Sequence, residues 1–269
     1  TVLGADDFAG VSAILEGVAS LLESGATHPT LELLFTTGEE HFCVGAKAFD
    51  AQRLQSKTAY VMDLSGPVGD CAVAAPTLIT FSAEVVGKAA HAGFAPEDGV
   101  HAIQVAAAAV ANLPSGRWGD VTVNVGTISG GRATNIVPDS CTVTGEIRAL
   151  CHQDALDRLN EIHSEFVEQA QAVDAKLNFN HTIHITGYRV DTDAPVAQRF
   201  RRACAAVGVA PRFTDTYGGS DCNILSAHGI QGLVVATAMN NCHAVNEYTT
   251  VEELCKAARL AQALMEKQD

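Results

Sequence analysis

The sequence predicts an α/β protein whose first domain is interrupted by a second, α+β domain. In 1–75 and 188–269, short apolar runs typical of buried strands alternate with segments that have the period of an amphipathic helix. In 76–187, strands and two helices follow one another in the order β-α-β-β-α-β, as in ferredoxin-like folds. We therefore expect one discontinuous domain, with a mostly parallel sheet flanked by helices, and an inserted domain with one sheet.

In the discontinuous domain, apolar side chains recur every three or four residues from Phe8 to Ser24, which predicts a helix. The carboxylates of Asp6 and Asp7 suit its positive end. The run Thr-Leu-Glu-Leu-Leu-Phe-Thr-Thr predicts a strand at 30–37. The other elements expected here are a short helix over 44–49, strands at 58–64, around Phe213 and at 232–237, and helices over 194–207, from Ser220 and from Thr249 or Thr250.

The inserted domain is expected to begin near Pro76, where polar and apolar residues start to alternate as in a half-buried strand. Its strands are predicted at 77–87, 121–128, 141–149 and 176–185, and its helices at 97–112 and 153–173.

Composition excludes several classes of protein. The 269 residues carry 17 Lys and Arg against 31 Asp and Glu, a formal net charge of −14, with 47% hydrophobic and 18% charged residues. This balance does not fit a disordered chain, and an acidic surface repels nucleic-acid phosphates. No apolar run approaches the roughly 20 residues that span a membrane.

The eight cysteines include no Cys-x-x-Cys pair and are expected to be reduced thiols of a cytoplasmic protein. No signal peptide is visible. Because the chain opens at Thr1 rather than at Met, we expect that an upstream segment is missing.

Groups that can bind metal follow three of the predicted strands. Glu39 and Glu40 follow the strand at 30–37, Asp63 ends the next one, and His243 follows the strand at 232–237. Ligands bind at the carboxyl ends of strands in open parallel sheets, and Asp6, in the loop before the first helix, can join such a site.

Four carboxylates in one place repel one another unless cations neutralise them, and zinc accepts carboxylate oxygen and imidazole nitrogen. Two metals can share a carboxylate, while another carboxylate acts as general base on a water. Each residue alone has a simpler explanation as a turn, a helix cap or an exposed side chain, so only the joint pattern predicts a metal site.

Six motifs occur in the order found in a family of zinc hydrolases that includes peptidase T, carboxypeptidase G and succinyl-diaminopimelate desuccinylase, and the chain most resembles the peptidase T-like tripeptidase branch. They are Gly-Ala-Asp-Asp-Phe-Ala-Gly (4–10), Thr-Thr-Gly-Glu-Glu (36–40), Gly-Lys-Ala-Ala-His-Ala-Gly (87–93), Thr-Asn-Ile-Val-Pro (134–138), Gly-Gly-Ser-Asp-Cys-Asn (218–223) and His-Ala-Val-Asn-Glu (243–247).

The resemblance implies a role for each predicted metal-site residue. Asp6 resembles the carboxylate that bridges two zinc ions, and Glu39 resembles the general base. Glu40 and His243 resemble the ligands of one zinc, and Asp63 resembles a ligand of the other. Two zinc ions per full-length subunit are implied, with Co²⁺ or Mn²⁺ as alternatives.

The inserted domain resembles the family's lid and dimerisation domain, which implies a homodimer. There, His91 resembles a histidine that reaches the partner subunit's active site. Asn135 and Arg148 resemble groups that hold the substrate carbonyl or carboxylate, and a guanidinium can clamp a carboxylate bidentately. Gly219 and Ser220 resemble the loop that lines the substrate pocket.

Two departures from the family pattern stand out. Phe8 occupies a position that is usually Lys, although this residue is not a ligand. The family's His-x-Asp motif, which supplies a zinc ligand upstream of the Asp-Asp motif, has no counterpart before Asp6. We therefore expect this polypeptide to bind metal weakly, or at one site only, and to be inactive.

The leading hypothesis is thus a dizinc exopeptidase that removes the N-terminal residue of tripeptides. An N-acyl-amino-acid amidohydrolase with the same metal site is the alternative within the family. A non-catalytic dimeric binding protein is the alternative from another class, and an acidic α/β protein whose carboxylates bind nothing is a third.

Overall fold

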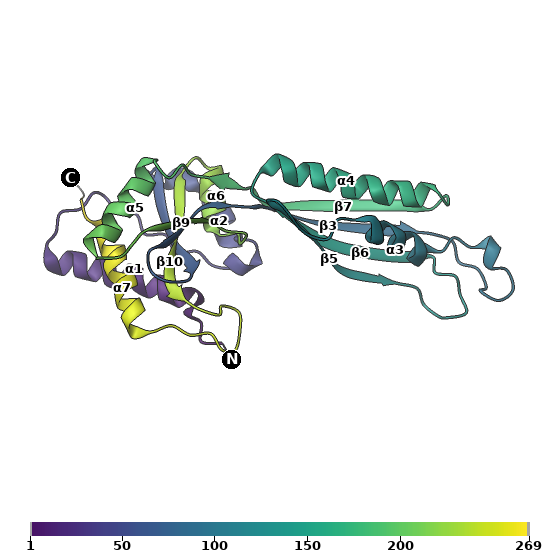
Figure 1. Cartoon of the computed structure of the whole chain (residues 1–269), viewed down its shortest axis with the longest axis horizontal. Helices are drawn as coiled ribbons and strands as arrows, with labels where there is room; N and C mark the ends of the chain where they lie inside the picture. Colours follow the sequence, from purple (N-terminus) through teal and green to yellow (C-terminus); the bar gives the residue numbers. More distant parts are fainter. Residues whose placement is uncertain (1, 268–269) are drawn as a thin grey trace. The chain divides into compact units, whose positions relative to one another are not determined.

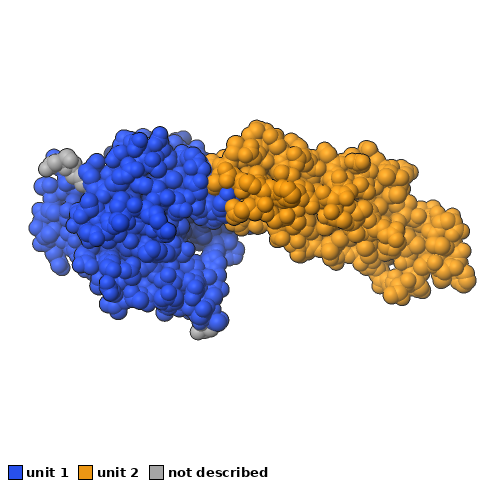
Figure 2. All heavy atoms as spheres, in the orientation of Figure 1, with its two compact units in different colours: residues 1–75, 188–269 blue, residues 76–187 orange. Residues whose placement is uncertain are grey.

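The computed structural model describes residues 2–267, and the chain divides into two compact units (Figure 2). Unit 1 comprises 1–75 and 188–269, and unit 2 comprises 76–187. Among the described residues, no helix combines the length and the apolar character needed to cross a membrane.

Unit 1 is built on a five-stranded sheet with the order β1-β10-β2-β8, in which β9 also pairs with β2. The pairings β1–β10 and β2–β9 are parallel, whereas β10–β2 and β2–β8 are antiparallel, so the sheet is mixed. The elements are α1 (Ala5–Ser24), the 3₁₀ turns η1 (Glu39–His41) and η2 (Ala51–Arg53), α2 (Val44–Ala48), β1 (Thr58–Ser65), β2 (Asp70–Ala75), β8 (Tyr188–Arg189), α5 (Pro195–Ala206), β9 (Arg212–Asp215), α6 (Asp221–Ala227), β10 (Gln231–Met239) and α7 (Val251–Met265).

The core of unit 1 explains why its strands read as continuous apolar runs. Residues 232–239 of β10 are all buried, because helices cover both faces of the sheet. The helices α1 and α5 both pack against α7, α2 packs against α6, and Figure 1 shows the two groups on opposite sides of the sheet. The predicted α/β class is confirmed.

The start of α1 lies very close to β1. A side chain at Gly10 would place its Cβ 2.0 Å from the carbonyl oxygen of Met62, so only glycine permits this approach. Asp7 Oδ1 accepts a hydrogen bond from the Gly10 N–H at 3.1 Å. The close contact brings the acidic start of α1 to the end of β1 that carries Asp63.

The prediction of a strand at 30–37 is wrong, because residues 26–36 form neither helix nor strand. A strand exists through hydrogen bonds to a neighbour, and β1, at the end of the sheet, pairs only with β10 among the described residues. A cavity of about 660 Å³ is lined by 29–36 and by 58–63 of β1. Leu33 and Phe35 therefore remain about half exposed.

Unit 2 has an antiparallel sheet with the order β4-β5-β6-β3-β7. The order of its four long strands, β5-β6-β3-β7, is that of a ferredoxin-like fold, which confirms the predicted α+β class. The elements are β3 (Thr77–Val86), the 3₁₀ turn η3 (Pro96–Asp98), α3 (Ala102–Asn112), β4 (Gly116–Trp118), β5 (Val121–Gly130), β6 (Ser140–Ala149), α4 (His152–Gln171) and β7 (Lys176–Ile185).

The helices α3 and α4 pack against each other and share one core with the sheet, which includes Phe166 of α4 and Ile147 of β6. The helix expected from residue 97 begins only at Ala102. Gly99 is extended, and His101 Nδ1 caps the helix by accepting a hydrogen bond from the Gln104 N–H at 3.3 Å. The α-helix is therefore shorter than its apolar pattern suggests.

Candidate metal centre

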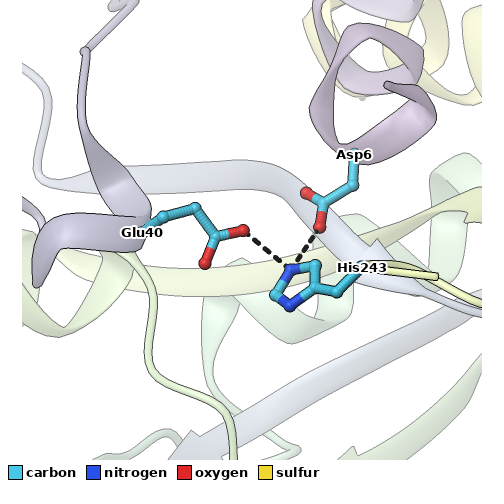
Figure 3. A group of neighbouring side chains, drawn as sticks. All are labelled: Asp6, Glu40 and His243. Carbon is cyan, nitrogen blue, oxygen red and sulfur yellow. Dashed lines mark hydrogen bonds and ion pairs between the residues drawn. The ribbon is translucent and has the colours of Figure 1, made fainter. Parts of the chain in front are cut away.

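Three of the predicted ligands of unit 1 meet in one place (Figure 3). His243 Nε2 lies 2.8 Å from Asp6 Oδ2 and 2.7 Å from Glu40 Oε1. One donor atom from each residue lies within 4.8 Å of the others. The three residues are far apart in sequence, so the fold alone assembles this group.

Irregular backbone presents each of the three side chains. Asp6 has φ −85° and ψ 104° at the start of α1, outside the helical range. Glu40 is the second residue of η1, which follows Gly38, and the φ of 69° at this position favours glycine. His243 has φ 64° in the loop after β10. These turns direct the two carboxylates and the imidazole to a common point.

A second group of carboxyl groups lies beside the first. The pKa of Asp63 is raised from 3.8 to about 8, mainly by burial and then by the carboxylates of Asp7, Glu39 and Asp6. The pKa of Asp7 is raised to about 7, mainly by burial and also by the nearby Asp6 and Glu39 carboxylates. A hydrogen bond from the Gly10 N–H lowers this pKa but does not offset the increase. Burial, then the Glu40 charge, raise the pKa of Glu39 to about 7.

This donor set fits divalent cations. Two carboxylates and an imidazole are ligands that zinc accepts, and Asp63 adds another carboxylate nearby. The charged groups with the largest effects on the pKa of Asp63 are all carboxylates, so the cluster has an excess of negative charge that a cation would neutralise. Glu40 also holds the pKa of His243 above its usual value, so protons compete with metal for this imidazole.

The raised pKa values predict an unusual pH dependence for the metal-free protein. Asp7, Glu39 and Asp63 retain protons in the folded state up to about pH 7–8 and lose them near pH 4 when unfolded. The folded state thus binds more protons across this range, and its free energy of unfolding falls as the pH rises. After EDTA treatment, we expect a lower melting temperature at pH 8 than at pH 5. Asp63→Asn should flatten the difference, and a melting temperature that rises with pH would contradict the prediction.

One carboxylate of this neighbourhood was missed in the sequence. Asp221, the first residue of α6, accepts a hydrogen bond from Thr36 Oγ1 through Oδ2. Its charge contributes to the raised pKa values of Glu39 and Asp63. The sequence signal was its place in the Gly-Gly-Ser-Asp-Cys-Asn motif, from which only Gly219 and Ser220 were selected.

The predicted substrate residues His91 and Asn135 belong to unit 2, where their two motifs pair with each other. His91 forms a β-bridge with Ile136, and the Ala92 N–H donates to the Asn135 carbonyl at 3.0 Å. His91 Nδ1 accepts hydrogen bonds from the N–H groups of Gly93 and Phe94, at 3.1 and 3.2 Å. The neutral ring therefore carries its proton on Nε2, which can act as a donor.

The other predicted substrate residues are held by local contacts. In β6 of unit 2, Arg148 Nε lies 2.9 Å from Glu146 Oε1. In unit 1, Ser220 follows Gly219 and is buried; its Oγ caps α6 by accepting a hydrogen bond from the Cys222 N–H at 3.2 Å. The structure thus divides the five predicted substrate residues between the two units.

The chain contains one His-x-Asp triplet that the sequence interpretation overlooked, His152-Gln153-Asp154. It begins α4 in unit 2, and His152 Nδ1 lies 3.1 Å from Thr77 Oγ1. The described contact of His152 thus lies within unit 2.

Two peptidase families or domains match parts of the chain. Residues 73–174 match the peptidase dimerisation domain, and residues 1–76 match peptidase family M28. The protein YqjE of Bacillus subtilis is 34% identical over 268 residues, which are 99% of this chain and 72% of YqjE.

Two solved structures share the fold along almost the whole chain. Aminopeptidase PepT from Bacillus cereus is 37% identical with a TM-score of 0.94, and a tripeptidase from Staphylococcus aureus is 29% identical with a TM-score of 0.95. Each match covers 98% of this chain and 71% of the other. The chain therefore belongs to the metallopeptidase family of peptidase T, carboxypeptidase G and succinyl-diaminopimelate desuccinylase, in its peptidase T-like branch.

Proposed function

We propose that the protein is a metal-dependent exopeptidase that acts on short peptides in the manner of a tripeptide aminopeptidase. The observation that carries the proposal is the meeting of Asp6, Glu40 and His243 in one place, next to the half-buried carboxyl group of Asp63. The likeness to an aminopeptidase and a tripeptidase over 98% of the chain supports the choice of substrate.

The proposed ligands divide into two sets that share one residue. Glu40 and His243 would hold one cation, Asp63 would hold a second, and Asp6 would contact both. Zinc is the cation we propose, because oxygen and nitrogen ligands suit it, and Co²⁺ and Mn²⁺ are alternatives. When bound, such a pair of cations polarises a carbonyl group and activates water.

Glu39 is proposed as the general base. It precedes Glu40 in η1 and lines the same cavity as Asp6 and Asp63. Its pKa of about 7 suits a group that must take up and release a proton near neutral pH. Because Glu40 raises this pKa, neutralisation of Glu40 by a cation would lower it and leave Glu39 ionised and ready to accept a proton.

Unit 2 is proposed to contribute to substrate binding in a homodimer, which its match to a peptidase dimerisation domain suggests. The Nε2–H of His91 would stabilise the oxyanion in the partner subunit's site. Asn135 and Arg148 would hold the substrate carbonyl or carboxylate, and Gly219 and Ser220 of unit 1 would line the pocket.

A metal-binding and turnover experiment tests this proposal. We expect a polypeptide of these 269 residues alone to bind Zn²⁺ weakly or at one site in calorimetry, because no His-x-Asp precedes Asp6 in it. We expect no turnover of tripeptides or N-acyl amino acids. Two tightly bound zinc ions with turnover would refute the expected inactivity, and a preference for N-acyl amino acids would favour an amidohydrolase. If no divalent cation binds, the metal centre itself is refuted and a binding protein is favoured.

A further inference from the structure

Glu247 is a buried carboxylate that lies beside the candidate metal centre but outside its donor set. Only 8% of the residue is exposed. Its Oε2 accepts a hydrogen bond from the Gly4 N–H at 2.7 Å, and its Oε1 accepts one from the Asp6 N–H at 2.9 Å. Each carboxylate oxygen therefore holds a backbone N–H group, and the residue acts on the segment that presents Asp6.

That segment needs an external anchor. The N–H groups at the start of a helix have no partners within the helix. Here Gly4 is left-handed, with φ 81°, and Asp6 and Asp7 depart from helical geometry, so the first residues of α1 do not hold themselves in place. Glu247, more than 240 residues away in sequence, supplies acceptors for two of these N–H groups.

The same loop carries both Glu247 and His243. The loop is closed at its base by two hydrogen bonds between the backbones of Asn240 and Tyr248, each 3.1 Å long. Within it, the Glu247 N–H donates to the Ala244 carbonyl at 3.0 Å. One closed loop therefore contacts Asp6 twice: His243 meets its carboxylate at 2.8 Å, and Glu247 holds its backbone N–H.

We infer that Glu247 is a positioning residue that fixes the Asp6 carboxylate against the His243 ring. Both oxygens of Glu247 accept hydrogen bonds from backbone N–H groups, and the described ligand group consists of Asp6, Glu40 and His243, so the effect of Glu247 on a bound cation passes through Asp6. Outer partners of this kind change metal affinity by about 10–100-fold when they are removed. As a role in a metal centre, this inference rests on the proposed function.

The test compares Glu247→Gln with Glu23→Gln, a matched change at an exposed position of α1. Glutamine keeps one acceptor oxygen but turns an NH₂ group toward the second N–H, so one of the two hydrogen bonds is lost. We expect faster amide exchange at Gly4 and Asp6, a shifted ring-nitrogen NMR signal for His243, and an affinity for Mn²⁺ lower by about 10–100-fold. Glu23→Gln should change none of these.

Two further measurements separate positioning from general destabilisation. Thermal melting shows whether Glu247→Gln remains folded at the temperature of the binding experiment. In an Asp6→Asn background, Glu247→Gln should cause little further loss of Mn²⁺ affinity, because both changes act through Asp6. A folded Glu247→Gln variant with unchanged Mn²⁺ affinity, or additive losses in the double variant, would overturn the inference.

Failure of the proposed function gives a different result. If the unaltered chain binds no Mn²⁺ or Zn²⁺, the metal centre is refuted. The ring-nitrogen NMR signal of His243, measured without metal, then decides whether Glu247 positions Asp6. A signal that Glu247→Gln shifts supports the placement of Asp6 by Glu247, and an unchanged signal overturns it.

Discussion

Replacing His243 with alanine is expected to lower the affinity for Zn²⁺ by more than the roughly 100-fold loss that follows removal of an outer partner. His243 is the single imidazole of the described cluster, and its Nε2 lies within 2.8 Å of both carboxylates. Its removal takes away the nitrogen ligand and leaves Asp6 and Glu40 to repel each other. Calorimetry with Zn²⁺ at pH 7.5, on protein first stripped with EDTA, measures the loss.

His228→Ala is the matched control for this experiment. His228 is an exposed histidine of unit 1 that follows α6, so its loss should leave Zn²⁺ affinity unchanged. Equal losses for the two variants would point to non-specific binding by surface histidines, and an unaffected His243→Ala variant would remove His243 from the site.

Replacing Phe166 with alanine is expected to lower the free energy of unfolding of unit 2 by about 3–5 kcal/mol. The residue is 0% exposed and packs in the core between α4 and the sheet, with its ring 6.4 Å from that of Phe179. Truncation removes apolar burial and leaves a cavity that the antiparallel sheet cannot close. Urea unfolding followed by circular dichroism gives the magnitude.

Phe94→Ala provides the contrast within unit 2. Its side chain is 86% exposed, so truncation should change stability by less than about 0.5 kcal/mol. Because the candidate metal ligands lie in unit 1, Phe166→Ala should also leave Zn²⁺ affinity intact below its melting temperature. A loss of affinity in that variant would show that the two units depend on each other.

The elements that the sequence predicted best are those whose burial is complete. The strand expected at 232–237 is part of the buried strand β10. A continuous apolar run of this length is typical of a strand that is covered on both faces. The meeting of Asp6, Glu40 and His243 was also predicted, although the strand that was expected to lead into Glu40 does not form.

The failures have a common physical origin in long-range contacts. The pattern at 30–37 suits a strand, but a strand requires a partner, and local sequence does not state whether one is present. Glu247 was quoted only as the end of a motif, because its role depends on N–H groups more than 240 residues away. Asp221 likewise meets Thr36 only in three dimensions.

At high protein concentration, we expect association with other chains to occur most readily along the unpaired edge of β1. In residues 2–267, one row of its peptide groups has no neighbouring strand, and rows of this kind template the addition of strands from other chains. The sequence Thr-Ala-Tyr-Val-Met at 58–62 is rich in side chains that favour such stacking, and the charge of Lys57 precedes it. Solubility at high protein concentration is therefore expected to depend on the charge of Lys57 at the start of this edge.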